Sequence, residues 1–446
     1  MRYDVMIIGG GPGGYTAANK AARNGLSVIL FEKNRIGGTC LNRGCIPMKS
    51  LIESARVLNS CREGDLYGIH GENISFDYER VNRRRDEVVS SLRSGVERSL
   101  KTNKVEVVYG RAKIVSPDTV SCEGELYCGD HIIIATGSVP SIPPIQGADL
   151  AIDSDAILEE DYRIPESLII IGGGVIGSEI ASALCTFGCR ITILEMAEHL
   201  LPTMDKDIGQ RLASYFRKRQ INAICSASVK GICESEGVLS VNYLDKNGVS
   251  QDLKAEQVLI ATGRKADLEG LFSEDCSPEI FRGVVSDEEG RTKIPGIYVI
   301  GDARSGNIQL AHVAEAQGEN VIDLILGKEP TNDMKTIPSG VYTDPEIATV
   351  GMTEKDLKGS EITYESHKSL TGANGKCLIE NSESGFVKVL TADGVILGGQ
   401  IIAPHATELI GELAIAVQKK MSMKEFAEVV HPHPTISEML WDVVKE

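Results

Sequence analysis

One unit occurs twice in this chain of 446 residues: an apolar strand, a glycine-rich turn, a helix and a second strand that ends in an acid. In both copies the acid stands 18 residues after the third glycine, from Gly14 to Glu32 and from Gly177 to Glu195. A single G-x-G-x-x-G is weak evidence, since glycine-rich turns are common, but two copies with equal spacing in the same frame are strong evidence. The repeat predicts an α/β chain with two Rossmann-like dinucleotide-binding units.

Each part of the repeat has a physical task in holding a dinucleotide. The first glycine makes the tight turn, the second lets the backbone approach the pyrophosphate, and the third lets the helix pack on the strand. The helix N-terminus presents free N–H groups to the phosphates, and the acid accepts hydrogen bonds from ribose hydroxyls. The predicted binding residues are Gly9, Gly11, Gly14 and Glu32 in the first copy and Gly172, Gly174, Gly177 and Glu195 in the second. The expected strands are 2–8, 27–31, 167–171 and 190–194, and the expected helices are 15–23 and a second that ends near residue 187.

Cys40 and Cys45 follow the first unit, and their spacing allows a disulfide that closes a loop of six residues. A loop this short stabilises a fold by about 2 kcal/mol at most in the chain-entropy model, and a chain of this length has core enough without it. A disulfide here is therefore better explained as an electron carrier. For an isolated C-x-x-x-x-C, however, two unpaired buried thiols are the more common arrangement. The spacing alone leaves both interpretations open.

The run from Gly37 to Lys49, GGTCLNRGCIPMK, resembles the redox-active segment of the pyridine nucleotide–disulfide oxidoreductase family. The resemblance extends from Tyr3 to Glu438, and the Leu-Asn … Ile-Pro version is most similar to the dihydrolipoamide dehydrogenase branch. It implies that Cys40 and Cys45 form a redox-active disulfide. Met48 departs from the Ser or Thr that is usual in the family, and we expect it to alter packing near the flavin.

The resemblance also implies an order of domains, with FAD on the first unit and NAD on the second. Residues 297–302 resemble the second flavin signature, whose acid, here Asp302, binds the ribitol chain, so the NAD unit is expected to be inserted into the FAD unit. A lone acid after a strand is more often a turn residue or a helix cap. Two Ala-Thr-Gly turns, ending at Gly137 and Gly263, mark the crossings between the units. The predicted domains are 1–145 (FAD, first part), 146–267 (NAD), 268–335 (FAD, second part) and 336–446 (dimerisation).

The last predicted domain has a different pattern. Apolar residues alternate at 385–390, and helices are expected at 406–419 and 423–430, which indicates an α+β unit with an antiparallel sheet. Near its end stands His-Pro-His-Pro-Thr at 431–435, which in isolation reads as a rigid loop with exposed histidines. The resemblance assigns His433 as the catalytic base and Glu438 as the acid that orients it, while His431 only shapes the loop.

Further site residues come from the same resemblance. Lys49 and Glu179 resemble a Lys–Glu pair beside the flavin, although both could be ordinary surface charges. Ala112 and Ala311 are expected among the residues that contact the cofactors. Glu195 favours NAD over NADP, because a carboxylate repels a 2′-phosphate and no Arg occurs at 196–199; Gly177 also matches the NAD pattern.

The implied activity is oxidation of dihydrolipoyl groups with reduction of NAD, in a homodimer whose partner is the lipoylated carrier protein of a 2-oxoacid dehydrogenase or glycine cleavage system. The nearest alternative is an NADPH-dependent reductase of a small disulfide such as glutathione. Mercuric reductase is disfavoured because the sequence ends without a cysteine pair, and a non-catalytic flavoprotein because both cysteines, His433 and Glu438 occur together.

Composition excludes other classes. A net charge of −17 argues against binding to nucleic acid or to an anionic membrane surface. No apolar run approaches the roughly 18 residues of a membrane span, and no signal peptide fits before the strand that begins near Tyr3. Nine further cysteines are scattered without a framework, which favours a reducing cytoplasm, and they lack the spacing of a zinc site.

Overall fold

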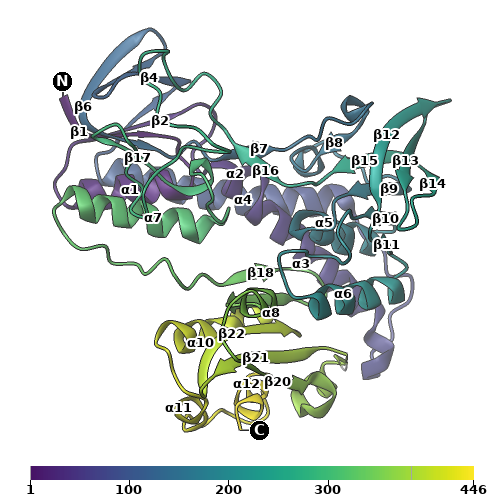
Figure 1. Cartoon of the computed structure of the whole chain (residues 1–446). Helices are drawn as coiled ribbons and strands as arrows, with labels where there is room; N and C mark the ends of the chain where they lie inside the picture. Colours follow the sequence, from purple (N-terminus) through teal and green to yellow (C-terminus); the bar gives the residue numbers. More distant parts are fainter. Residues whose placement is uncertain (1, 383, 446) are drawn as a thin grey trace.

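A computed structural model of the chain describes residues 2–382 and 384–445 and has three lobes (Figure 1). The N-terminus lies in the upper left lobe of this view, the second lobe lies to the right, and the C-terminus lies in the lobe at the bottom. Within the described ranges, no helix combines the length and the apolar character needed to cross a membrane.

The first lobe is built on a seven-stranded sheet in the order β3-β2-β1-β6-β5-β4, with β17 also paired to β6. Strands β1, β2, β3, β6 and β17 run parallel. Every residue of β2 is buried, as expected for a parallel strand that is covered on both faces. The strands are β1 (Arg2–Ile8), β2 (Val28–Glu32), β3 (Glu106–Tyr109), β4 (Ala112–Ser116), β5 (Thr119–Cys122), β6 (Glu125–Ile134) and β17 (Ile297–Val299).

Helices α1 (Pro12–Arg23) and α7 (Ala311–Ile325) pack together on this sheet, although they are almost 300 residues apart in the chain (Figure 1). Two glycines allow the close approach: a Cβ on Gly318 would lie 2.6 Å from the carbonyl oxygen of Gly13, and a Cβ on Gly13 would lie 2.9 Å from that of Ala314. Because β17 and α7 follow the second lobe in sequence, the second lobe is an insertion in the first. The other helices here are α2 (Gly38–Arg43), α3 (Cys45–Arg62) and α4 (Tyr78–Thr102).

The second lobe repeats the architecture with a parallel five-stranded sheet, in the order β11-β10-β9-β15-β8, and an antiparallel meander of β12, β13 and β14. Between the first two lobes lies a short ribbon of β7 (Ser138–Pro140) and β16 (Arg264–Ala266), directly after the two Ala-Thr-Gly turns. The remaining elements are β8 (Ile152–Asp153), β9 (Ser167–Ile171), α5 (Val175–Thr186), β10 (Arg190–Leu194), α6 (Lys206–Lys218), β11 (Asn222–Ile224), β12 (Ser228–Ser235), β13 (Val238–Leu244), β14 (Ser250–Ala255) and β15 (Gln257–Ile260).

The third lobe is an antiparallel five-stranded sheet in the order β18-β19-β22-β21-β20, with helices packed on it. Its strands are β18 (Ser339–Val341), β19 (Ile347–Gly351), β20 (Glu365–Leu370), β21 (Phe386–Ala392) and β22 (Val395–Ile402). Its helices are α8 (Glu354–Lys358), α9 (Gly375–Ile379), α10 (Ala406–Gln418), α11 (Met423–Ala427) and α12 (Glu438–Val443). Together the lobes form the expected α/β chain with an inserted second unit and a C-terminal α+β unit, while the residue boundaries proposed for the domains stay predictions.

A buried lysine joins the second lobe to the third. Lys388, in the middle of β21, has a side chain with 0% exposure. Its Nζ donates to Asp205 at 2.7 Å, to Asp207 at 2.9 Å and to Glu354 at 3.0 Å. Asp205 and Asp207 stand at the start of α6 and Glu354 at the start of α8, so this one ammonium group is bonded to both lobes.

Four expected elements differ in their ends, and the smallest difference is in α10, which ends at Gln418 and not at residue 419. Helix α1 starts at Pro12 and not at residue 15, because proline suits the first helical position, where no intrahelical bond needs its N–H. Strand β2 is shifted to Val28–Glu32, which places Glu32 on the strand itself. Helix α11 ends at Ala427, before residue 430, and the chain then enters the proline-containing segment 431–435.

Candidate active site

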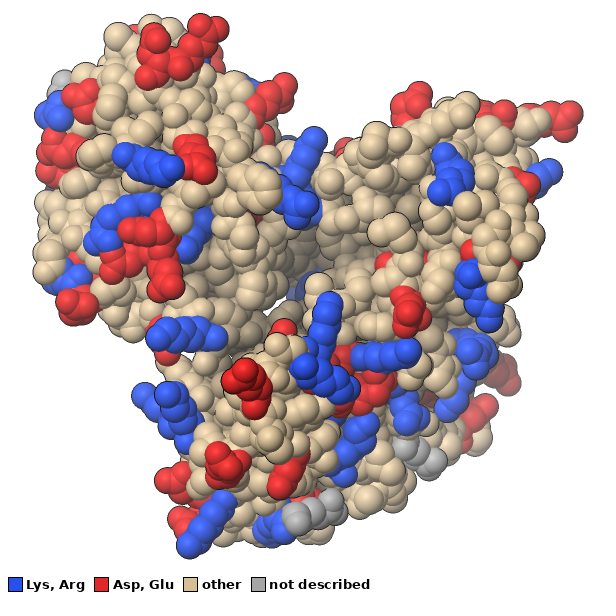
Figure 2. Space-filling model, viewed as in Figure 1, with Lys and Arg blue, Asp and Glu red and all other residues tan. Residues whose placement is uncertain are grey.

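One large cavity of about 1450 Å³ lies between the first two lobes and reaches the third. Figure 2 shows the hollow between the two upper lobes, with acidic and basic side chains interspersed over the visible face. A cavity this size exceeds the roughly 300–1,000 Å³ that holds one small ligand. The predicted residues that line it are Gly9, Gly11, Glu32, Cys40, Cys45, Lys49, Ala112, Gly137, Gly172, Gly174, Glu179, Glu195, Gly263, Asp302 and Ala311.

The first and third glycines of each repeat are required by the protein's own packing. Gly9 has a φ of +111°, and a Cβ there would lie 2.2 Å from the carbonyl oxygen of Ala135. A Cβ on Gly14 would lie 1.8 Å from that of Gly9, and a Cβ on Gly177 would lie 2.1 Å from that of Gly172. Gly14 and Gly177 therefore hold helix against strand below the cavity, which agrees with their absence from its lining.

The middle glycines are different, because no protein atom requires them. A Cβ on Gly174 would meet nothing within 4 Å, and a Cβ on Gly11 would meet only the Cα of Gly38 at 3.8 Å. Both are N-cap residues, of α5 and α1, and both line the cavity. The open space above each helix N-terminus fits a pyrophosphate, so the residues present suit two dinucleotides.

The two acids are held in the same way in both repeats. Glu32 accepts hydrogen bonds from the backbone N–H of Gly10 at 2.8 Å and of Asn34 at 2.7 Å. Glu195 accepts from Gly173 at 2.6 Å and from Ala197 at 2.7 Å. Both side chains are buried in the cavity wall. The carboxylates are thus fixed in position, with lone pairs left for ribose hydroxyls.

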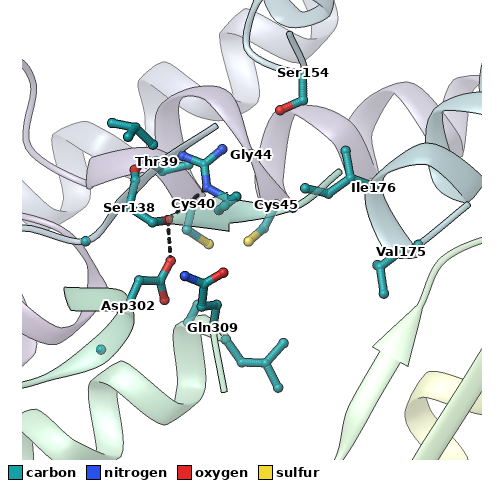
Figure 3. A pocket seen from close by; sticks show the side chains of 18 of the residues that line it. Thr39, Cys40, Gly44, Cys45, Ser138, Ser154, Val175, Ile176, Asp302 and Gln309 are labelled. Carbon is teal, nitrogen blue, oxygen red and sulfur yellow. Dashed lines mark hydrogen bonds between the residues drawn. The ribbon is translucent and has the colours of Figure 1, made fainter. Parts of the chain in front are cut away.

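Cys40 and Cys45 lie on consecutive helices, because the helical path breaks at Gly44 between α2 and α3. Both thiols are free in this structure, and their sulfurs face one another across the break (Figure 3). A hydrogen bond from Cys40, aided by the charge of Lys49, lowers the pKa of Cys45 to about 7, although burial opposes the shift. The same hydrogen bond, together with burial, raises the pKa of Cys40. The pKa of Cys45 therefore lies below that of Cys40, so Cys45 is the more readily ionised thiol of the pair.

Lys49 and Glu179 form an ion pair between the first two lobes. Lys49 Nζ lies 3.0 and 2.8 Å from the two carboxylate oxygens of Glu179, and 4.6 Å from the ring centre of Tyr342. The Glu179 side chain is only 4% exposed and also accepts a bond from the backbone N–H of Tyr342. This environment excludes an ordinary surface charge and puts a fixed cation near Cys45.

Asp302 lies in the turn Gly301–Ala303 after β17, and Figure 3 shows it in the same pocket as the two sulfurs. Ser138 Oγ donates to its carboxylate at 2.6 Å, and Arg264 Nε donates to Ser138 Oγ at 2.8 Å. Burial raises the pKa of Asp302. Asp302 does not cap α7, which has no side-chain cap, and it lines the cavity, so its position suits a ligand there.

The sequence did not reveal Ser138, Arg264 or Tyr342 as neighbours of these groups. Ser138 directly follows the first Ala-Thr-Gly turn and Arg264 the second, so the repetition of that turn was a usable signal. For Tyr342 the sequence offered no such signal, because this residue belongs to the third lobe and lies near Lys49 only in the folded chain.

His433 and Glu438 form the expected pair outside the cavity. His433 Nδ1 lies 2.9 Å from Glu438 Oε1, and the histidine side chain is 81% exposed. The backbone N–H of Thr435 also binds Glu438, and these two contacts lower the pKa of that carboxyl. Neither residue lines the cavity that holds the cysteines. A single chain therefore assembles the thiols and the histidine pair separately.

Among residues 2–382 and 384–445, no group of three or more His, Cys, Asp or Glu side chains could hold a metal ion. Met48, the unusual residue before Lys49, is buried and belongs both to the cavity wall and to the core shared with the second lobe.

Comparison with known proteins agrees with a chain of two dinucleotide-binding lobes and a third, C-terminal lobe. Residues 3–318 match the family described as pyridine nucleotide-disulphide oxidoreductase, and residues 337–444 match its dimerisation domain. A dihydrolipoyl dehydrogenase of Bacillus subtilis is 36% identical over 462 residues, covering 98% of this chain and 96% of the relative. One of Haloferax volcanii is 34% identical, covering 99% and 95%.

Among solved structures, the Cu(II) complex of the HOCl-induced flavoprotein disulfide reductase RclA from Escherichia coli is similar, with a TM-score of 0.88 and 28% identity over 100% of this chain and 99% of that one. The whole length of the chain is thus matched by flavoprotein disulfide oxidoreductases and their relatives. The chain belongs to the pyridine nucleotide–disulfide oxidoreductase family.

Proposed function

We propose that the protein is a dihydrolipoyl dehydrogenase, which oxidises protein-bound dihydrolipoyl groups and reduces NAD. The observation that carries the proposal is one cavity in which two dinucleotide cradles meet at the facing thiols of Cys40 and Cys45. The curated relatives with full-length similarity that bear this name support the choice of substrate.

FAD belongs on the first repeat, beside Glu32, Asp302, Ala112 and Ala311, and NAD on the second, beside Glu195. When bound, FAD supplies a two-electron carrier between the dithiol and NAD. The protein's part is to hold the cradles, to fix the Lys49–Glu179 pair between them and to control the protons of the sulfurs.

The chemistry at sulfur follows from the asymmetry of the cysteines. One substrate thiol gives its proton to Nε2 of His433, which Glu438 leaves free by binding Nδ1, because the thiolate is the attacking form. The substrate thiolate attacks Cys40 of the Cys40–Cys45 disulfide, and Cys45 leaves as the thiolate. The second substrate thiol then displaces Cys40, which takes up that thiol's proton. The substrate becomes a disulfide, and the cysteines accept two electrons.

We further propose that the active unit is a homodimer and that the substrate is a separate lipoylated carrier protein. The dimerisation domain at 337–444 and the exposed His433 support the first point, and the names of the relatives support the second. The scattered spacing of the nine further cysteines supports a reducing cytoplasm as the location.

A reductase of a small disulfide is the second candidate, since the similar structure from E. coli is named a flavoprotein disulfide reductase. Steady-state rates separate the two: dihydrolipoamide with NAD should be turned over far faster than glutathione disulfide with NADPH. The opposite order of rates would exclude the dihydrolipoyl dehydrogenase assignment.

A further inference from the structure

The segment that carries His433 holds a second histidine in an unusual environment. His431 has a side chain only 6% exposed, whereas His433, two residues later, is 81% exposed. The His431 ring lies between two aromatic rings, with centroid distances of 5.8 Å to Phe426 of α11 and 6.0 Å to Trp441 of α12. Each histidine also has its own glutamate.

Both ring nitrogens of His431 face acceptors. Nδ1 lies 3.0 Å from the carbonyl oxygen of Val429, and Nε2 lies 2.9 Å from a carboxylate oxygen of Glu412 on α10. A carbonyl never donates, and the oxygens of a carboxylate, here those of the 42% exposed Glu412 side chain, likewise accept. Two donors are needed, and only the imidazolium form of histidine supplies both.

The surroundings favour a cation. Aromatic faces within about 6 Å attract positive charge. The charged groups around the ring are the carboxylates of Glu412 from α10 and Glu438 from α12, opposed by Lys445, whose Nζ lies 2.8 Å from the Trp441 ring centre. His433 itself binds Glu438 through Nδ1 alone and offers Nε2 as a base.

We propose that His431 is a positioning residue of the active-site loop: as an imidazolium it ties the segment that carries His433 to α10 and α12. Loss of one proton would leave a nitrogen lone pair facing an acceptor, which breaks one of the two bonds and frees the loop. His433 then no longer meets the substrate thiol in a productive geometry. The consequence for catalysis rests on the proposed function, whereas the protonation state does not.

The first test is direct and independent of any substrate. Nitrogen-15 NMR of histidine-labelled holoenzyme, with His431→Gln used to assign the signal, should show both ring nitrogens of His431 protonated at neutral pH. A single protonated nitrogen would overturn the proposal.

The second test uses a matched pair of variants in dihydrolipoamide oxidation. His431→Gln should lower kcat about 10- to 100-fold, as expected when a catalytic group is misplaced by about 1 Å. Under this proposal the wild-type kcat should decline at alkaline pH, where His431 loses its second proton. Glu412→Gln should keep activity and lack that decline, because its amide can donate to a neutral His431. NADH-driven ferricyanide reduction, which does not need His433, controls for folding.

The two tests distinguish a failure of the positioning role of His431 from a failure of the proposed function. A His431→Gln enzyme with wild-type kcat and pH profile, or a Glu412→Gln enzyme with an unchanged alkaline decline, would contradict the positioning role. If dihydrolipoamide proves not to be a substrate, the proposed function fails, and the NMR result still decides the state of His431.

Discussion

Neighbouring residues make the two cysteines of the active site unequal. The hydrogen bond from Cys40 and the charge of Lys49 place the pKa of Cys45 at about 7. In the reduced enzyme, the ultraviolet absorbance of the thiolate should therefore disappear as the pH falls through about 7. Lys49→Met should move this titration to higher pH, because the thiolate loses its cation.

Cys45→Ser is the control for that titration. It should remove the thiolate signal and all dihydrolipoamide turnover while FAD stays bound, since the glycines of the first repeat and Glu32 are unchanged. Unchanged turnover in Cys45→Ser, or an unchanged midpoint in Lys49→Met, would contradict the assigned roles.

Glu195 sets the choice of pyridine nucleotide. Two backbone bonds hold its carboxylate in place, so it cannot swing away from a 2′-phosphate. We expect kcat/KM for NAD to exceed that for NADP by at least about two orders of magnitude, a penalty of ~3 kcal/mol. Glu195→Gln removes the charge at nearly constant size, so it should reduce the ratio of kcat/KM for NAD to kcat/KM for NADP. Equal efficiency with both nucleotides in the wild type would refute this.

At the scale of elements, the strand–turn–helix unit separates residues that build the fold from residues that hold the ligand. Gly174→Ala adds a Cβ that meets no protein atom, so the thermal midpoint should not fall, but the methyl group occupies the space above the α5 N-terminus. NAD affinity should drop while FAD binding stays normal.

Gly177→Ala is the matched comparison within the same turn. Its Cβ would lie 2.1 Å from the carbonyl oxygen of Gly172, so the helix must shift. Overpacking of this kind costs about 1–3 kcal/mol. Denaturation measures the stability of both variants, and nucleotide titration measures their NAD affinity. A stable Gly177→Ala together with an unstable Gly174→Ala would contradict the packing role of Gly177 and the ligand-binding role of Gly174.

The sequence could predict the elements that local patterns determine, but not the contacts between distant residues. The strands at 2–8, 167–171 and 190–194 were predicted with their observed ends, because apolar runs and glycines act locally. The pairing of Lys49 with Glu179 came only from the family resemblance. The bonds of Lys388 to Asp205 and Asp207 and those of Arg264 to Ser138 were not predicted, since they join residues more than 100 positions apart. No local pattern encodes such contacts.

For the whole molecule, Lys388 is a fully buried polar link between the second and third lobes. Burial alone would raise the pKa values of Asp207 and Glu354, but hydrogen bonds from lysines, Lys388 among them, lower both. Carboxyls with a lowered folded pKa contribute stability above their unfolded pKa of about 4. That contribution is lost as the pH falls through the folded values.

Lys388→Met should therefore be destabilised by about 3–5 kcal/mol at neutral pH, because Asp205 is left as a buried, unpaired charge. Its free energy of unfolding should also fall less steeply in acid than that of the wild type. Urea denaturation across this pH range tests both points, and parallel curves for the two proteins would rule out the link.

The last prediction is that two subunits share each active site. The cysteines belong to the first lobe and open into the cavity, while the exposed His433 stands on the third lobe and does not line that cavity. We expect a second copy of the chain, joined through the dimerisation domain, to bring a His433 to each pair of cysteines. His433→Gln should lose about 10²- to 10⁴-fold in dihydrolipoamide turnover, the usual effect of losing a general base, and still reduce ferricyanide with NADH.

Mixing subunits decides whether the site is shared. Cys45→Ser and His433→Gln homodimers are each expected to be inactive with dihydrolipoamide. In a heterodimer, one site combines intact cysteines with an intact His433 and the other lacks both, so activity should return toward half of the wild type per dimer. Subunit exchange, with two different affinity tags to isolate heterodimers, provides the measurement. Isolated heterodimers that stay inactive, or a monomer with full turnover, would show that each chain builds its site alone.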